Sequence, residues 1–182
     1  GSEYRGDYGL SEEELIRFHR KRITTLIAAS PDILACETIP CLVEAKALVR
    51  LMKEHQGVYS WFSFSARDGK HTNYGESLAE CARFLDDCPQ VAAVGINCTA
   101  PIHVESLIDE IKRGTDKPIV VYPNKGETYD PLTKTWVQDS LIPQFSELAI
   151  RWYKKGAKII GGCCRTTPDD IHDIATWAAG LR

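Results

Sequence analysis

Apolar segments of two lengths alternate along the chain, and this alternation predicts helices and strands in turn. Ser11 and Glu14 form a capping box, so a helix should begin there and run to about residue 29. It carries apolar residues at helical spacing, namely Leu15, Ile16, Phe18, Ile23, Leu26 and Ile27. Residues 32–37 follow as a short apolar run that ends in a carboxylate and is closed by Pro40, as is typical of a buried strand.

The same helix and strand unit then recurs to the end of the chain. Further strands are predicted at residues 58–64, 91–96, 117–122 and 158–160. Helices are predicted at residues 42–55, 77–85, 104–112 and 145–155, with a closing helix from an N-cap at Thr167 and Pro168 to about residue 179. Residues 125–142 are expected to form a long polar loop. The total is five strands and six helices.

Strands that alternate with helices, each apolar on both faces, indicate a parallel sheet covered by helices. A closed (β/α)8 barrel needs eight strands and about 250 residues, whereas this chain has 182. We therefore expect an incomplete TIM barrel that lacks the first three strands, with residues 1–182 forming the C-terminal portion of a single domain. The alternative is a complete five-stranded open sheet of the flavodoxin type.

Polar and thiol side chains gather where the predicted strands end. In parallel α/β folds the chemistry lies at the carboxyl ends of the strands. The residues at these ends are Glu37, Ser63, Asn97, Cys98, Tyr122, Asn124, Cys163 and Cys164. A random distribution would have placed some of them at the opposite ends, so this coincidence predicts an active site.

Composition narrows the class of protein. The apolar content of 43% is enough for a substantial core, and a formal charge of −3 lacks the basic excess of a nucleic-acid binder. No apolar stretch approaches the ~20 residues of a membrane span. Seven cysteines are an odd number in a chain too large to require disulfides, so we expect reduced thiols and a cytoplasmic location. Cys36, Cys41, Cys81 and Cys88 lie among apolar or helical residues and are expected to be buried and inert.

The remaining three thiols predict a metal site. Cys163 and Cys164 follow two glycines after the last predicted strand. Cys98 follows the strand at residues 91–96, and one other strand separates these two strands. Three thiolates suit Zn²⁺ and leave its fourth position open, as in catalytic zinc sites. Coordination at that position would deprotonate an incoming thiol. A redox role for the vicinal pair is a weaker alternative.

Three motifs closely resemble the zinc-dependent homocysteine S-methyltransferase family. They are Gly95-Ile96-Asn97-Cys98-Thr99-Ala100-Pro101, Val120-Val121-Tyr122-Pro123-Asn124 and Gly161-Gly162-Cys163-Cys164-Arg165-Thr166-Thr167-Pro168. Two more, Ala35-Cys36-Glu37-Thr38-Ile39-Pro40 and Tyr4-Arg5-Gly6-Asp7-Tyr8, look like the branch that uses S-methylmethionine. The resemblance implies a (β/α)8 barrel and methyl transfer from a sulfonium donor to homocysteine, giving methionine.

The resemblance also implies roles for single residues. Cys98, Cys163 and Cys164 match the zinc ligands, and Glu37 matches a carboxylate that binds the homocysteine amino group. We assign Asn97 and Tyr122 to the substrate pocket, with loop hydrogen bonding as the alternative. Tyr129 and Trp136 would make residues 125–142 a lid or aromatic wall for the cationic donor, with packing of the loop against the protein as the alternative. The donor is expected to be S-methylmethionine or S-adenosylmethionine, with no nucleic-acid or membrane partner. The competing hypothesis is a non-catalytic zinc-binding or thiol-binding module.

Overall fold

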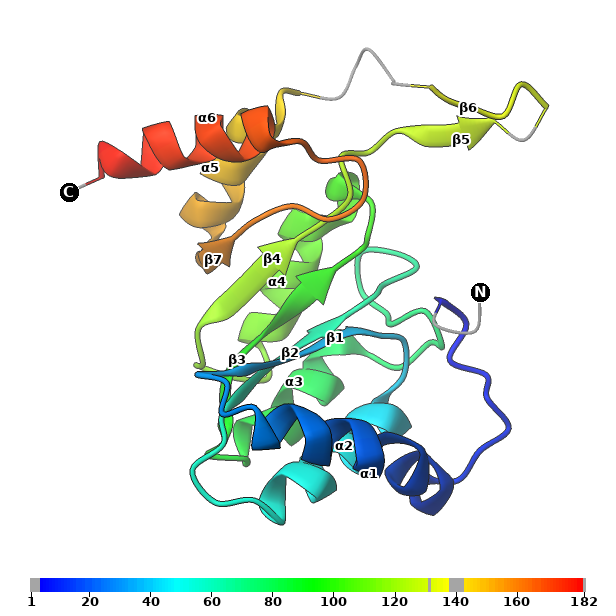
Figure 1. Cartoon of the computed structure of the whole chain (residues 1–182). Coiled ribbons are helices and arrows are strands. Elements are labelled where there is room, and N and C mark those ends of the chain that lie inside the picture. Colours follow the sequence, from blue (N-terminus) through cyan, green and yellow to red (C-terminus); the bar gives the residue numbers. More distant parts are fainter. Residues whose placement is uncertain (1–3, 131, 138–142, 182) are drawn as a thin grey trace.

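The computed structural model describes residues 4–130, 132–137 and 143–181, in which helices and strands alternate (Figure 1). The helices are α1 (Glu12–Ala28), α2 (Leu42–Lys53), α3 (Leu78–Asp86), α4 (Val104–Lys112), α5 (Phe145–Lys155) and α6 (Pro168–Ala179). The main strands are β1 (Leu34–Ile39), β2 (Ser60–Phe64), β3 (Val91–Asn97), β4 (Ile119–Tyr122) and β7 (Ala157–Ile160). A short 3₁₀ helix, Pro101–His103, precedes α4. The predicted alternation of elements is confirmed.

The five main strands form one parallel sheet in the order β1-β2-β3-β4-β7. Neighbours in the sheet are therefore also neighbours along the chain, as in a barrel. A doubly wound sheet would reverse its order at a switch point, so the flavodoxin-type alternative is wrong. The helices cover one face of the sheet and leave the other face open (Figure 1).

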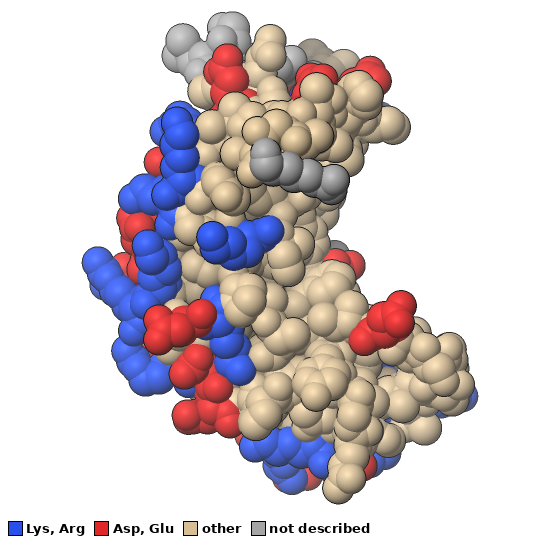
Figure 2. Space-filling model, turned by 90° about the vertical axis from the view of Figure 1, so that its left-hand side faces the viewer, with Lys and Arg blue, Asp and Glu red and all other residues tan. Residues whose placement is uncertain are grey.

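The core lies between the sheet and its helices. Its largest fully buried side chains include Trp152 of α5, Phe62 and Phe64 of β2, and Leu107 of α4. Charged side chains gather on this convex, helix-covered side, and the opposite side is hollowed (Figure 2). The strands were predicted to be buried on both faces, and for the two edge strands this is wrong, since β7 exposes Lys158 and Ile159 and β1 exposes one face. Leu34 and Cys36 are buried against the helices, whereas Ala35 and Glu37 are exposed on the alternate face.

Both helix starts that the sequence marked with N-caps have the predicted geometry. The Ser11 hydroxyl accepts from the Glu14 amide, and the Glu14 carboxylate accepts from the Ser11 amide at 2.8 Å. Thr167 and Asp170 make the same reciprocal pair, with Pro168 in the first turn of α6. Such boxes satisfy amides that a helix start leaves unpaired. They fix where α1 leaves the N-terminal segment and where α6 leaves the Cys163–Cys164 turn.

The long loop predicted at residues 125–142 is wrong in part, because it contains a two-stranded antiparallel hairpin. Strand β5 (Thr128–Asp130) pairs with β6 (Thr135–Val137), and Tyr129 lies opposite Trp136 in the register. Three-residue strands in a polar stretch give too short a period-two pattern to be recognised. The hairpin and the N-terminal segment both lie at the side to which the strands' carboxyl ends point (Figure 1). Residues 131 and 138–142 lie outside the described part, so the proposed lid is only partly described.

None of the helices in the described part of the chain combines the length and apolar character needed to cross a bilayer.

Candidate metal centre

Three thiols from two strand ends meet at the carboxyl edge of the sheet. The sulfurs of Cys98, Cys163 and Cys164 all lie within 4.8 Å of one another. Cys98 Sγ is 3.3 Å from Cys163 Sγ and 3.5 Å from Cys164 Sγ, and all three residues are free cysteines. Cys98 and Cys163 are partly buried and Cys164 is exposed. The structure therefore brings together residues that lie 65 positions apart in sequence.

The last residue of β4 and the two residues after it hold the two thiol-bearing loops together. The carbonyl oxygen of Tyr122 accepts from the Cys98 amide at 3.3 Å, and that of Pro123 accepts from the Cys163 amide at 2.9 Å. Asn124 extends the bridge, because its amide donates to Thr99 O and its side-chain oxygen accepts from the Cys164 amide. Hydrogen bonds like those of the sheet thus continue past the strands, and they bring the sulfurs to one point.

The turn that carries the vicinal pair depends on Gly162. A Cβ on this residue would lie 2.4 Å from Thr166 Oγ1 and 2.6 Å from Thr166 Cβ. Thr166 cannot simply move away, because its hydroxyl donates to the Cys163 carbonyl at 2.7 Å. Gly161 is less constrained, since a Cβ there would meet only Tyr122 Cβ at 3.6 Å. Close packing at Gly162 therefore lets the chain turn so that neighbouring cysteines face the same point.

Burial disfavours the ionised form of each thiol in the cluster. It is the main cause that raises the pKa of Cys98, Cys163 and Cys164 above that of an ordinary thiol. The hydrogen bond with the Tyr4 hydroxyl, 2.9 Å from Cys98 Sγ, acts in the opposite direction and offsets part of this rise in the pKa of Cys98. A bound cation reverses the effect of burial, because thiolates are the form that coordinates metal. Metal binding at this cluster would therefore displace protons and would weaken as the pH falls.

The spacings of the other two sulfurs from that of Cys98 are compatible with a tetrahedral ion. With Zn–S distances of about 2.3 Å, tetrahedral ligands lie about 3.8 Å apart. The spacings of 3.3 and 3.5 Å from Cys98 are close to this value and far from the ~2.05 Å of a disulfide. A set of three soft donors suits Zn²⁺ and leaves one position free.

A hydrogen-bonded network fixes Glu37 on the open face of the sheet. The Tyr122 hydroxyl donates to Glu37 Oε2 at 3.1 Å, while Trp61 Nε1 donates to the Tyr122 oxygen at 3.0 Å. Ser63 Oγ lies 2.5 Å from the same oxygen and supplies the remaining donor. Burial raises the pKa of Tyr122, so its hydroxyl stays protonated and can donate. Among the described residues Oε1 of Glu37 has no hydrogen-bonding partner, which leaves it available to a ligand.

Asn97 lies beneath this surface and bridges two strand ends. Its side-chain oxygen accepts from the Thr38 amide at 2.8 Å, and its amide nitrogen donates to Thr38 Oγ1 at 2.7 Å. Thr38 has a φ of 58°, which is unusual for a β-branched residue. Asn97 is only 1% exposed. This geometry favours a role in holding Thr38, and so the adjacent Glu37, over direct contact with substrate.

The other cysteines are buried as predicted, with exposures of 6% or less. Burial raises the pKa of Cys36 and of Cys41 to about 12, consistent with inert thiols. His19 of α1 is also buried, because it is 6% exposed and its side chain is bonded to Glu44. Sequence reasoning also missed two residues next to the site, Tyr4 and Thr38. Both lie in motifs quoted for the family resemblance, and that was the only signal that could have identified them.

Comparison with known proteins decides the family. The model of the homocysteine S-methyltransferase family matches residues 1–178. The chain belongs to the homocysteine S-methyltransferase family. It is 57% identical to homocysteine S-methyltransferase YbgG of Bacillus subtilis over 182 residues, which are 100% of this chain and 58% of the relative. It is 49% identical to homocysteine S-methyltransferase 3 of Zea mays, covering 96% of this chain and 53% of the relative. The chain thus spans little more than half the length of these family members.

A solved member of the family has the same fold. The metallated form of the homocysteine methyltransferase MmuM from Escherichia coli superposes with a TM-score of 0.84 at 38% identity, covering 97% of this chain and 56% of that one. The prediction that this chain is part of a (β/α)8 barrel is confirmed. This chain has two features of such a barrel. Its main strands are ordered as they occur along the chain, and its helices cover a single face of the sheet (Figure 1).

Proposed function

We propose that this protein binds Zn²⁺ through Cys98, Cys163 and Cys164 and transfers a methyl group from a sulfonium donor to L-homocysteine. The observation that supports this most strongly is the meeting of three free thiols within 4.8 Å at the carboxyl edge of the sheet. Membership of the homocysteine S-methyltransferase family supplies the reaction class. Because the chain spans little more than half the length of its relatives, the activity of the whole protein is itself part of this proposal.

The chemistry requires a thiolate at neutral pH. A free thiol with a pKa of about 8.5 is mostly protonated at pH 7. Zinc with one open position supplies the coordination that removes this proton. The three cysteines would hold the ion, and the turn at Gly162 would keep two of them on the same side of it. Alignment of the attacking sulfur, the methyl carbon and the leaving sulfur then lowers the barrier.

The donor most favoured is S-methylmethionine, and S-adenosylmethionine is the alternative. In either case the attacking sulfur forms a new S–C bond while the donor's S–CH₃ bond breaks. The thiolate's negative charge and the sulfonium's positive charge cancel, so both products are neutral thioethers. With S-methylmethionine, both products are methionine. The support for this donor is the resemblance of residues 4–8 and 35–40 to the branch that uses it.

A turnover assay tests the proposal. The full-length protein loaded with zinc is incubated with homocysteine and each donor in turn, and methionine is measured. We expect methionine with S-methylmethionine at a higher kcat/KM than with S-adenosylmethionine. A protein that binds zinc through the three thiols but forms no methionine with either donor would instead be a zinc-binding or thiol-binding module.

Glu37 is proposed to bind the amino group of homocysteine. Its carboxylate is held by Tyr122 through one oxygen, and the other is available on the open face. Glu37→Gln keeps the shape and removes the charge, so a charge-assisted hydrogen bond worth about 1.5–3 kcal/mol is weakened. We expect the KM for homocysteine to rise about tenfold or more, with a smaller change in kcat.

The matched control for this prediction is Glu13→Gln. Glu13 lies in the first turn of α1, where its side chain is 61% exposed and pairs with Arg50. The KM for homocysteine should stay as in the unmodified protein. A normal KM in Glu37→Gln would remove Glu37 from the proposed binding site.

A further inference from the structure

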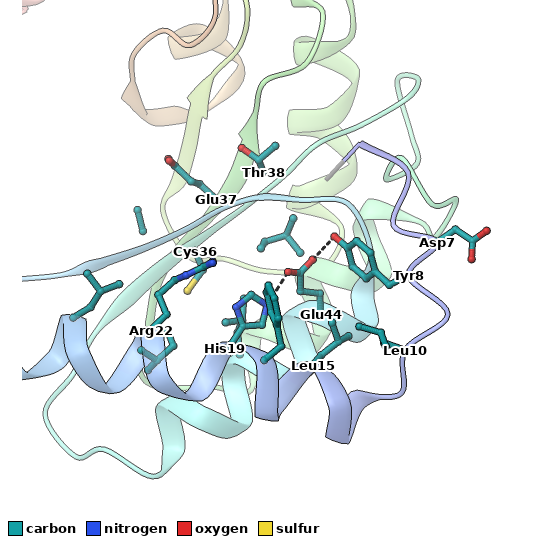
Figure 3. A pocket seen from close by; sticks show the side chains of 16 residues that line it. Asp7, Tyr8, Leu10, Leu15, His19, Arg22, Cys36, Glu37, Thr38 and Glu44 are labelled. Carbon is teal, nitrogen blue, oxygen red and sulfur yellow. Dashed lines mark hydrogen bonds and ion pairs between the residues drawn. The ribbon is translucent and has the colours of Figure 1, made fainter. Parts of the chain in front are cut away.

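The N-terminal segment connects the thiol cluster to a cavity on the other side of β1. At one end, the Tyr4 hydroxyl lies 2.9 Å from Cys98 Sγ. At the other end, the Tyr8 hydroxyl donates to Glu44 Oε2 at 2.7 Å. Tyr8 and Glu44 line a cavity of about 640 Å³ between α1 and β1 (Figure 3). The motif Tyr4-Arg5-Gly6-Asp7-Tyr8 thus spans the distance between two polar clusters.

The middle of this segment is closely packed. Gly6 is buried with a φ of 67°, a conformation that favours glycine. A Cβ there would lie 2.9 Å from Tyr74 Cβ and 3.0 Å from Cys41 Cβ, so no side chain fits. The backbone is therefore pressed against the loops that follow β1 and β2. The packing of Gly6 therefore fixes the course of the backbone that places Tyr4 beside Cys98.

A buried carboxylate holds the far end. Glu44 on α2 receives the Tyr8 hydroxyl on one oxygen and His19 Nε2 on the other, at 2.8 Å. The side chains of His19 and Glu44 point toward each other (Figure 3), and they are only 7% and 10% exposed. Removing either partner would leave a buried charged oxygen without its hydrogen bond, which is costly. The network of Tyr8, Glu44 and His19 is therefore a firm attachment point.

The hydrogen bond at Cys98 has a defined direction once the sulfur is a thiolate. A thiolate carries no proton, so the hydroxyl of Tyr4 has to donate and the sulfur accept. Hydrogen bonds to a ligating atom withdraw electron density from it and tune the metal. Such contacts also set the electronic properties of other thiolate-bound metal centres.

We propose that Tyr4 is a positioning residue of the metal centre, holding Cys98 Sγ by a hydrogen bond that the Tyr8–Glu44–His19 attachment keeps in place. This inference rests on the proposed function, in that the three thiols hold a divalent ion. The inference adds the side chain of Tyr4 to the three cysteines of the site. It also implies that His19 on α1 and Glu44 on α2 affect the metal centre without contacting it.

Cobalt substitution of the full-length protein tests this inference, because Co²⁺ reports its thiolate ligands through charge-transfer absorption. In Tyr4→Phe the Cys98 sulfur loses a donor and becomes more electron-rich, so the thiolate-to-cobalt band should move to longer wavelength. The affinity for Co²⁺, measured by chelator competition, should fall about tenfold, as is typical when an outer hydrogen bond to a ligand is lost.

Tyr8→Phe separates positioning from simple contact. Tyr8 bonds to Glu44 rather than to a cluster thiol, yet its loss should shift the band in the same direction by a smaller amount. Tyr59→Phe is the matched control, because Tyr59 is 51% exposed and precedes the amino end of β2. It should leave both band and affinity unchanged.

The outcomes that contradict the inference are distinct. A Tyr4→Phe protein with an unmodified band and affinity would refute the role of Tyr4 while leaving the metal site intact. A response to Tyr4→Phe with none to Tyr8→Phe would refute the attachment through Glu44. An unmodified protein that binds Co²⁺ without any thiolate band would refute the proposed function, and this inference with it.

Discussion

Replacement of Cys98 by serine is expected to abolish tight metal binding and, with it, methyl transfer. Cys98 is the thiol that lies within 3.5 Å of both members of the vicinal pair, so it closes the ligand set. A serine hydroxyl is not deprotonated at neutral pH and is a poor ligand for a soft site. We expect the affinity for zinc to fall by at least about a hundredfold, measured by chelator competition, and methionine formation to fall with it.

Cys88→Ala is the matched control for this variant. Cys88 is 2% exposed and lies just before β3, at the amino end of the strand that leads to Cys98. Its replacement should lower the free energy of unfolding by about 1 kcal/mol, as expected for a small buried side chain, and leave zinc affinity unchanged. Full turnover by Cys98→Ser at normal zinc affinity would rule out the proposed ligand set.

Gly162→Ala is expected to damage the metal centre without adding or removing a ligand. The new methyl group would overlap the Thr166 side chain at 2.4–2.6 Å, so the turn that orients Cys163 and Cys164 has to move. A displacement of this size would move the sulfurs of Cys163 and Cys164 away from that of Cys98. We expect zinc affinity and kcat to fall by about tenfold to a hundredfold, while circular dichroism shows the helices and sheet intact.

The adjacent glycine provides the control for that prediction. In Gly161→Ala the methyl group meets Tyr122 Cβ at 3.6 Å, which is ordinary van der Waals contact. Zinc affinity and turnover should therefore stay near those of the unmodified protein. Equal losses in the two variants would show that the turn needs glycine for backbone freedom at both positions, contrary to the packing argument.

Much of the fold follows from local signals in the sequence. Ser11 with Glu14, and Thr167 with Pro168, mark helix starts that are found at those residues. Helices α4 and α5 have the predicted bounds, because Gly114 and Gly156 end clear apolar periodicities. The parallel sheet followed from the alternation itself. These features depend on residues close together in the chain, and this is why they could be predicted.

What the sequence could not supply are contacts between distant residues. The hairpin of β5 and β6 is too short and polar to give a periodic pattern. His19 reads as an exposed helical residue, and only its pairing with Glu44, 25 positions away, explains its burial. Asn97 looked like a pocket residue because it ends a strand, yet both atoms of its side-chain amide bond to Thr38. Tyr4 meets Cys98 across 94 positions, a contact that no local pattern encodes.

Zinc-edge X-ray absorption on the purified full-length protein, combined with its metal content, tests the account most directly. We predict one zinc per protein with three sulfur ligands at about 2.3 Å and one lighter ligand, and four sulfurs once homocysteine is added. Zinc bound only through nitrogen and oxygen, or a protein that stays metal-free in excess zinc, would contradict the account.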